Sequence, residues 1–295
     1  MQFICLVKTD LTYMRIDPLF KSILLFVSVI FFCKSIDAAE VNLKAHEDSI
    51  NHYFNMLAME TSDAEKIRFN QKILEYFRET LKNEESFDHP FSSLKNVGII
   101  TSEDNKLRII TWNLPYNDRT HKYYGFVQYK KSNRSYNLFE LQDKSVSIKK
   151  PELVVLDHEN WYGALYYSII TNKYKGTIYY TLLGADLNDV LIKKKVIDIL
   201  YFSDDDQPVF GKRVFKNKSY PAARVIFEFN AQTSMTLTYD EEKEMIVFDH
   251  LSPSQPSLKG QYEFYGPDFS YDGLKFERGI WNAYTDIDVR DYNIE

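Results

Sequence analysis

The 295-residue chain has only two cysteines, Cys5 and Cys33, and both lie near its N-terminus. The rest of the chain therefore lacks thiols. This excludes a disulfide framework, a thiol nucleophile and thiolate metal sites from residue 34 onward. A domain formed by that part must rely on core packing, which a chain long enough for one large or two modest domains can supply.

The sequence also lacks the short motifs that identify common catalytic and nucleotide-binding sites. It contains no G-x-S-x-G, no H-E-x-x-H, no phosphate-binding loop and no glycine pattern typical of dinucleotide binding. Its six histidines form no pair at metal-ligand spacing within one element, so a histidine metal site would need ligands from distant segments. We therefore predict no cofactor and assign no catalytic residue.

The N-terminal apolar run is too short to cross a bilayer as a helix, which needs about 20 residues. It covers the twelve residues 22–33, with Arg15 and Lys21 before it and small residues after it. This order is typical of a secretory signal peptide over residues 1–38. We expect cleavage after Ala38 or Ala39. The alternative is an uncleaved anchor or a buried helix.

A cleaved leader predicts a periplasmic or extracellular protein with no integral membrane span left after processing. A start at Met14 would give a leader of more ordinary length. Residues 1–38 hold four basic and three acidic side chains, so removing them changes the net charge from −6 to −7. An acidic protein is poorly suited to bind a phosphate backbone, and we predict no nucleic-acid partner. The oligomeric state is left open.

Residues 39–89 show the period of two amphipathic helices. In the first helix the apolar positions at helical spacing are Leu43, Ile50, Phe54 and Leu57. A second helix is predicted to begin near Ser62, where Glu65 completes a capping box. Its apolar stripe consists of Ile67, Ile73, Leu74, Phe77 and Leu81. We therefore predict a helical hairpin whose apolar stripes pack against the rest of the protein.

The pattern of residues 90–295 instead predicts short strands separated by turn residues. The candidate strands are 97–101, 107–113, 123–129, 136–141, 163–171, 177–184, 195–202, 208–215, 224–230, 234–239, 245–249 and 261–265. Strands of this length and spacing predict a mainly β domain, either an antiparallel β-sandwich or a curled meander sheet. A small β-propeller is the alternative. Within the domain, residues 224–249 are expected to form three consecutive strands of one meander.

Aromatic residues are abundant, with 22 Tyr, 21 Phe and 3 Trp. Neighbouring rings on a strand point to opposite faces, so one ring of each doublet faces solvent, a partner or a second layer of the protein. Exposed rings suit a sugar, a peptide or an envelope protein as ligand. The alternative is that they only cover the second face of a sheet. On this basis we predict ligand-binding roles for Trp161, Tyr162, Tyr262 and Tyr265.

The proline-rich loop 251–260 precedes the second of these aromatic clusters and is predicted to be a functional rim. Because His250 and Asp268 lie on either side of this loop, we predict that they also bind the ligand. Both His158 and His250 have acidic neighbours in the chain, which could orient an imidazole as a general base. The alternative is a histidine at a strand end that bonds only to the backbone.

We predict no metal site. The alternative is that a polar turn near residue 186 binds a cation. Asp186, Asn188 and Asp189 supply the oxygen atoms that calcium prefers, although their spacing does not match an EF-hand. Aspartate and asparagine also stabilise plain hairpin turns through bonds to the backbone, and this second interpretation predicts no metal.

Four segments resemble a group of uncharacterised exported proteins of Gram-negative bacteria. They are NWYGALYY at 160–167, YYTLLG at 179–184, KVIDILYF at 195–202 and VFDHLSP at 247–253, and the resemblance covers roughly residues 90–290. It implies a bacterial envelope setting and carries no assigned activity or site residue. We therefore predict an exported cell-envelope binding or interaction protein. The alternative is a periplasmic or secreted hydrolase of glycans or another envelope polymer that uses Asp, Glu or His.

Overall fold

Two antiparallel helices begin the part of the chain that the computed structural model describes, which is residues 42–132, 135–216 and 221–288. They are α2 (Leu43–Met59) and α3 (Asp63–Thr80), and they confirm the predicted hairpin. No helix among these residues is long and apolar enough to span a membrane. The predicted leader lies outside the described residues. The helices and all the sheets belong to one compact unit that starts at Leu43.

The predicted apolar stripes of the helices are buried except for Leu43, which is half-buried, and Ile67. Ile50, Phe54 and Phe77 are at most 3% exposed, whereas Ile67 is 41% exposed and lies outside the core. The capping box is not formed. Ser62 occupies the N-cap position of α3 without a side-chain capping bond.

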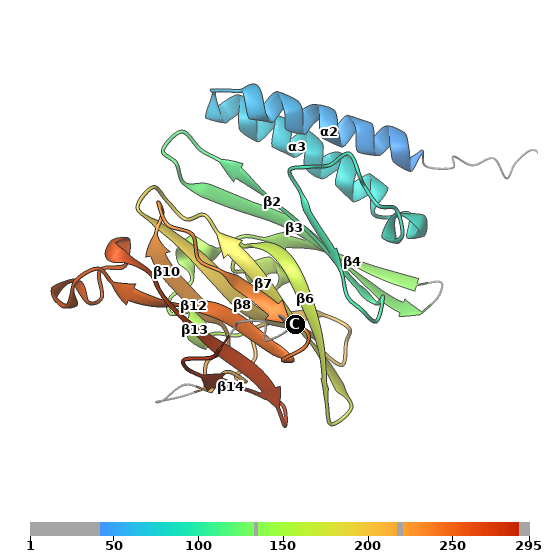
Figure 1. Ribbon diagram of the computed structural model, residues 1–295. Helices are drawn as coiled ribbons and strands as arrows, with labels where there is room; N and C mark the ends of the chain where they lie inside the picture. Colours follow the sequence, from blue (N-terminus) through green and yellow to red (C-terminus); the bar gives the residue numbers. More distant parts are fainter. Residues whose placement is uncertain (1–41, 133–134, 217–220, 289–295) are drawn as a thin grey trace, which may run out of the picture. The chain divides into compact units, whose positions relative to one another are not determined.

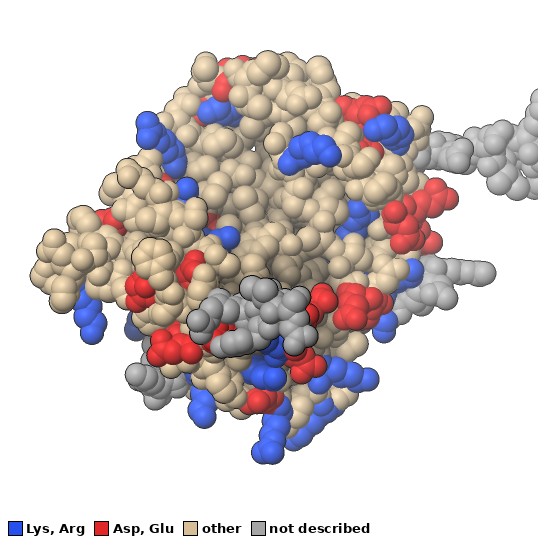
Figure 2. All heavy atoms as spheres, viewed as in Figure 1, with Lys and Arg blue, Asp and Glu red and all other residues tan. Residues whose placement is uncertain are grey.

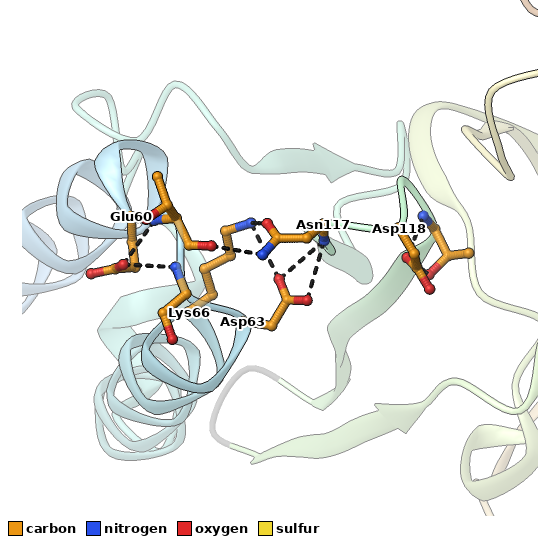
Figure 3. Close-up of polar contacts among 8 residues, drawn as sticks. Glu60, Asp63, Lys66, Asn117 and Asp118 are labelled. Carbon is orange, nitrogen blue, oxygen red and sulfur yellow. Dashed lines mark hydrogen bonds and ion pairs between the residues drawn. The ribbon is translucent and has the colours of Figure 1, made fainter.

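The turn between the helices is instead held by carboxylates and by the loop that follows strand β2, Leu107–Pro115 (Figure 3). Asp63 accepts the backbone N–H of Asn117 at 3.1 Å, and Asn117 Nδ2 donates to the carbonyl of Thr61 at 2.7 Å. Lys66 Nζ donates to Asn117 Oδ1 at 2.9 Å. The side chain of Glu60 accepts the backbone N–H groups of Thr61 and Ser62, which lie between the two helices. These bonds fasten the hairpin to the first sheet at one end.

Three antiparallel sheets follow, which confirms the mainly β prediction. The first sheet has the order β1-β2-β3-β4, and its strands are β1 (Gly98–Thr101), β2 (Leu107–Pro115), β3 (His121–Ser132) and β4 (Ser135–Gln142). The second has the order β5-β9-β8-β7-β6 with β10 also on β8, and comprises β5 (Leu156–Asp157), β6 (Leu165–Tyr174), β7 (Thr177–Asp186), β8 (Ile192–Phe202), β9 (Pro208–Phe210) and β10 (Val225–Asn230). The third has the order β11-β12-β13-β14, with β11 (Leu237–Asp240), β12 (Met245–Pro253), β13 (Tyr265–Glu277) and β14 (Ile280–Tyr284).

The helices and sheets are stacked as successive layers (Figure 1). One core lies between the helices and the first sheet, a second between the first and second sheets, and a third between the second and third sheets. In β2, Ile110 and Trp112 face the helices, while Leu107 and Ile109 face the second sheet. This explains why β2 is a nearly continuous buried run rather than an alternating strand. Among the described residues the first and third sheets share no core.

Two sequence predictions on the strands are wrong. Residues 224–249 do not form one meander, because β10 pairs with β8 of the second sheet, whereas β11 pairs with β12 of the third. The side chain of Asn230 accepts the N–H of Gln232 at 2.7 Å, and the chain turns there from one sheet to the other. The predicted strand 261–265 is a short 3-10 helix, η6 (Tyr262–Phe264), and a regular strand starts only at Tyr265.

A buried carboxylate on α2 ties the helices to the segment before β1. Glu47 is 1% exposed, and its side chain accepts the N–H of Ser93 at 2.6 Å and lies 2.9 Å from His89 Nε2. Burial alone would raise the pKa of Glu47, but the bonds from Ser93 and His89 outweigh it and lower that pKa to about 2. The ionised carboxylate therefore stabilises the fold.

We expect the free energy of unfolding of Glu47→Gln to fall by roughly 2–3 kcal/mol at pH 7. Because the folded pKa lies below the ordinary 4.5, the wild-type advantage is complete above pH 4.5 and disappears as the pH falls through 2. Urea unfolding at pH 7 and near pH 2 measures both effects. Asp48→Asn, at an exposed neighbouring carboxylate, is the control. An equal loss at both pH values would contradict the assignment.

Candidate functional site

A β-bulge interrupts the pairing of β12 with β13. Asp249 pairs with Tyr271 and Leu251 pairs with Pro267, so His250 alone stands opposite three residues of β13. Those three residues, 268–270, are called the β13 bulge below. Bulges of this kind redirect side chains and are common next to functional sites.

Hydrogen bonds from both strands hold the β13 bulge in place. Asp268 accepts bonds from the hydroxyl groups of Ser252 and Ser270, both at 2.7 Å, and from the N–H of Ser270 at 3.2 Å. The Ser252 and Ser270 hydroxyl groups together lower the pKa of Asp268, so this exposed side chain is ionised at neutral pH. The bulge is therefore a built feature rather than a frayed strand.

Phe269 is the residue that the bulge presents. Its side chain is 95% exposed, and its backbone φ is +71°. A left-handed conformation costs a bulky residue roughly 1–2 kcal/mol, and burial of the exposed ring would be favourable. Neither the left-handed backbone of Phe269 nor its exposed ring stabilises the folded state. Because strained backbone positions cluster at functional sites, Phe269 is a candidate binding residue.

Further aromatic rings lie on the segment just before the bulge. Tyr262 and Phe264 of η6 are 40% and 42% exposed, and the rings of Tyr262 and Tyr265 are 5.1 Å apart between centroids. The hydroxyl of Tyr265 accepts the N–H of Gly260 at 2.9 Å, which fixes the preceding turn. Together with Asp268 and Phe269 these three residues are called the bulge surface.

The bulge surface includes part of a shallow pocket at the projecting end of the third sheet. The pocket has a volume of about 360 Å³, and Phe264, Tyr265 and Asp268 line it together with Asn230 and Ser252. Figure 1 shows the orange-red segment between β12 and β13 extending beyond the sheets at the left. In Figure 2 the same projection is mostly tan, with few charged side chains.

His250 forms an ion pair with a residue next to the bulge. Its Nδ1 lies 2.7 Å from Asp272 Oδ2, and this bond raises the pKa of His250 above its ordinary 6.5. The negative charges of Asp268 and Asp286 act in the same direction. The surroundings of His250 are therefore acidic.

We expect an NMR titration of the His250 ring to have its midpoint above pH 6.5. Asp272→Asn should lower that midpoint markedly because it removes the bonded carboxylate, and Asp268→Asn should lower it less. An unchanged midpoint in Asp272→Asn would refute the pairing.

Four of the six predicted ligand-binding residues, Tyr262, Tyr265, Asp268 and His250, thus lie on or beside the β13 bulge. The other two, Trp161 and Tyr162, are 0% and 3% exposed. They are not available to a surface ligand, because each ring packs inside and uses its polar group there. Trp161 Nε1 donates to the hydroxyl of Tyr166 at 3.1 Å, and the Tyr162 hydroxyl donates to Asp186 at 3.2 Å.

The alternative metal ligands also bond internally. Asp186 is 5% exposed and accepts bonds from the Tyr123 hydroxyl and from the N–H of Asn188. Asp189 accepts the N–H groups of Leu191 and Ile192, as a turn-stabilising aspartate does. No group of three or more His, Cys, Asp or Glu in the described parts of the chain could hold a metal ion.

His158 does not make the contact that its acidic neighbours suggest. Asp157 instead accepts the N–H groups of Glu159 and Asn160. The Nδ1 of His158 is buried without a hydrogen-bond partner among the described residues, and the ring lies edge-on to Phe139 at 5.3 Å. Nothing in this geometry prepares His158 as a base.

Sequence reasoning missed Phe269, Ser252 and Asp272. The spacing of Asp268 and Ser270 carried one signal, since an aspartate two residues before a serine favours a local side-chain turn. No protein-family model, curated protein or solved structure matches the chain.

Proposed function

We propose that this is an exported binding protein of the cell envelope and that the bulge surface holds a neutral glycan. The observation that carries the proposal is the 95% exposed ring of Phe269 on a strained bulge that hydrogen bonds hold in place. An exposed ring offers an apolar face for the C–H groups of a sugar, and the fixed backbone keeps the ordering cost of binding low.

Polar groups beside the rings supply what sugar hydroxyls need. Asp268 is ionised and exposed, and it lines the pocket with Ser252 and Asn230. A few polar groups placed among aromatic walls are the usual composition of a small-molecule site. An apolar peptide would cover the ionised Asp268 without adding hydrogen bonds to it, and this favours a glycan over such a peptide.

The charge near the bulge favours a neutral ligand. The carboxylates of Asp268, Asp272 and Asp286 all act on His250. An anionic polymer or an anionic membrane surface would be repelled there.

Export rests on the predicted leader, and an envelope setting also rests on the resemblance to exported proteins of Gram-negative bacteria. A glycan is a natural ligand in that setting. N-terminal sequencing of the secreted product tests the location, and a mature chain that begins before Ser22 would contradict it.

Thermal unfolding in the presence of neutral oligosaccharides tests the binding. We expect one of the tetramers of glucose, mannose, xylose or N-acetylglucosamine to raise the Tm, because a ligand at 100 times its Kd adds about 2.7 kcal/mol. Polygalacturonate, an acidic polymer, is the control and should leave the Tm unchanged. A Tm that responds to none of the neutral sugars would overturn the proposal.

A hydrolase of the same glycans is the second candidate, because the His250–Asp272 pair at 2.7 Å is the arrangement that orients a histidine base. Release of new reducing ends that is lost in His250→Gln would favour this activity. Binding without release would favour the non-enzymatic function. Ser252 donates to Asp268, and the geometry does not present it as a nucleophile toward His250.

A further inference from the structure

A larger cavity lies between the second and third sheets. Its volume is about 760 Å³, well within the range of about 300–1,000 Å³ for ligand sites. The wall from the second sheet is the start of β10, where Val225 and Phe227 are only partly buried. Phe248 of β12 and Leu274 of β13 form the lining from the third sheet.

The walls of the cavity are apolar, and their rings are already ordered. Phe227 and Phe248 lie 4.7 Å apart between centroids, and Phe215, at 3% exposure, closes one side. An apolar body placed here would cover the ring of Phe227, which the fold leaves partly open, and this is favourable by the hydrophobic effect.

The charged groups that line the cavity are two lysines, one glutamate and one arginine. Arg224 is fully buried and committed, since it forms bonds of 3.1 Å with both oxygens of Asp198 and donates to the carbonyl of Pro151. Lys150, Lys216 and Glu152 are exposed, and the described residues provide no ion-pair partner for them. Among the described residues, the uncommitted charge that lines the cavity is therefore one net positive.

We propose that this cavity binds an amphiphile with a single anionic group and an apolar chain, such as a fatty acid. The chain would lie between β10 and the third sheet, and the carboxylate would lie toward Lys150 and Lys216. This site is separate from the bulge surface, and its charge has the opposite sign, so each proposal can fail without the other.

Fluorescence titration with cis-parinaric acid tests the proposal, with dodecanoate and 1-dodecanol as competitors. We expect saturable binding that dodecanoate displaces at least about threefold more effectively than the uncharged alcohol. Lys150→Glu should weaken binding by about threefold or more, whereas Lys149→Glu, at the neighbouring exposed lysine, should not. Ala283→Trp, which places a large ring at the cavity lining, should abolish binding.

Three outcomes would overturn the proposal. They are an absence of saturable binding, equal displacement by the acid and the alcohol, and displacement by an extended apolar peptide but not by dodecanoate. If Ala283→Trp unfolds, the comparison of Lys150→Glu with Lys149→Glu decides the matter alone. Unchanged binding in both lysine variants would then refute the site.

Discussion

Phe269→Gly is expected to abolish glycan binding while leaving the protein as stable as before or more stable. The ring is 95% exposed and supplies little packing, so its removal costs the fold almost nothing. Glycine adopts the φ of +71° without the steric cost that phenylalanine bears there. The greater freedom of glycine in the unfolded chain offsets part of this gain, so we expect a change between zero and about +1 kcal/mol.

The measurement is a pair of curves for each variant, namely thermal unfolding and titration with the oligosaccharide that raises the wild-type Tm. Arg119→Gly is the matched control, because Arg119 is exposed at a φ of +67° in the loop between β2 and β3. It should show the same backbone effect and retain full binding. Retained binding in Phe269→Gly would contradict the assignment of this ring to the glycan site, and a loss of several kcal/mol in its stability would show that the ring serves the fold.

Arg224→Met is expected to give a large loss of stability, about 3–5 kcal/mol. Arg224 and Asp198 are both fully buried, and the guanidinium bonds to both carboxylate oxygens at 3.1 Å. Removal of the cation leaves an unpaired carboxylate in the interior, and that uncompensated charge rather than the lost bond dominates the cost. Asp198→Asn should also be destabilising, because it leaves the buried guanidinium of Arg224 without a negative partner.

The double variant Arg224→Met/Asp198→Asn should recover a large part of the loss. The asparagine oxygen at the Oδ1 position can still accept from the N–H of Ile199, and the amide nitrogen at the Oδ2 position can donate to the hydroxyl oxygen of Tyr166, which donates to Asp198 in the wild type. Urea unfolding of the two single variants and the double variant gives the coupling energy of the pair. Strictly additive losses would contradict the assignment of a coupled buried pair.

The helices and most strands could be predicted because their signals are local. The helical spacing of Ile50, Phe54 and Leu57 arises because they face one core, and the continuous apolar runs of β7 and β8 arise because each strand has a core on both faces. The division into sheets could not be predicted, because pairing such as that of Val225 with Ile197 joins residues far apart in the chain. No strand was predicted after residue 265, so most of β13 and all of β14 were missed; glycine, proline and aspartate interrupt the apolar pattern of β13.

The candidate site was predictable in part for the same reason. Tyr262, Tyr265, Asp268 and His250 stand close together in the chain, and a local cluster of rings and polar groups is visible in the sequence. Whether an aromatic pair faces a ligand or the core depends on layers that only the fold shows. Trp161 and Tyr162 therefore share the signal but lie inside.

The most direct test of the account is a map of backbone amide shifts in NMR spectra of the protein as the active oligosaccharide is added. We predict shifts concentrated at residues 262–272 and at the facing end of β12, with the amides of α2 and α3 unchanged. Shifts centred on the helices or on the cavity beside β10, or no shifts at saturating sugar, would contradict glycan binding by the bulge surface.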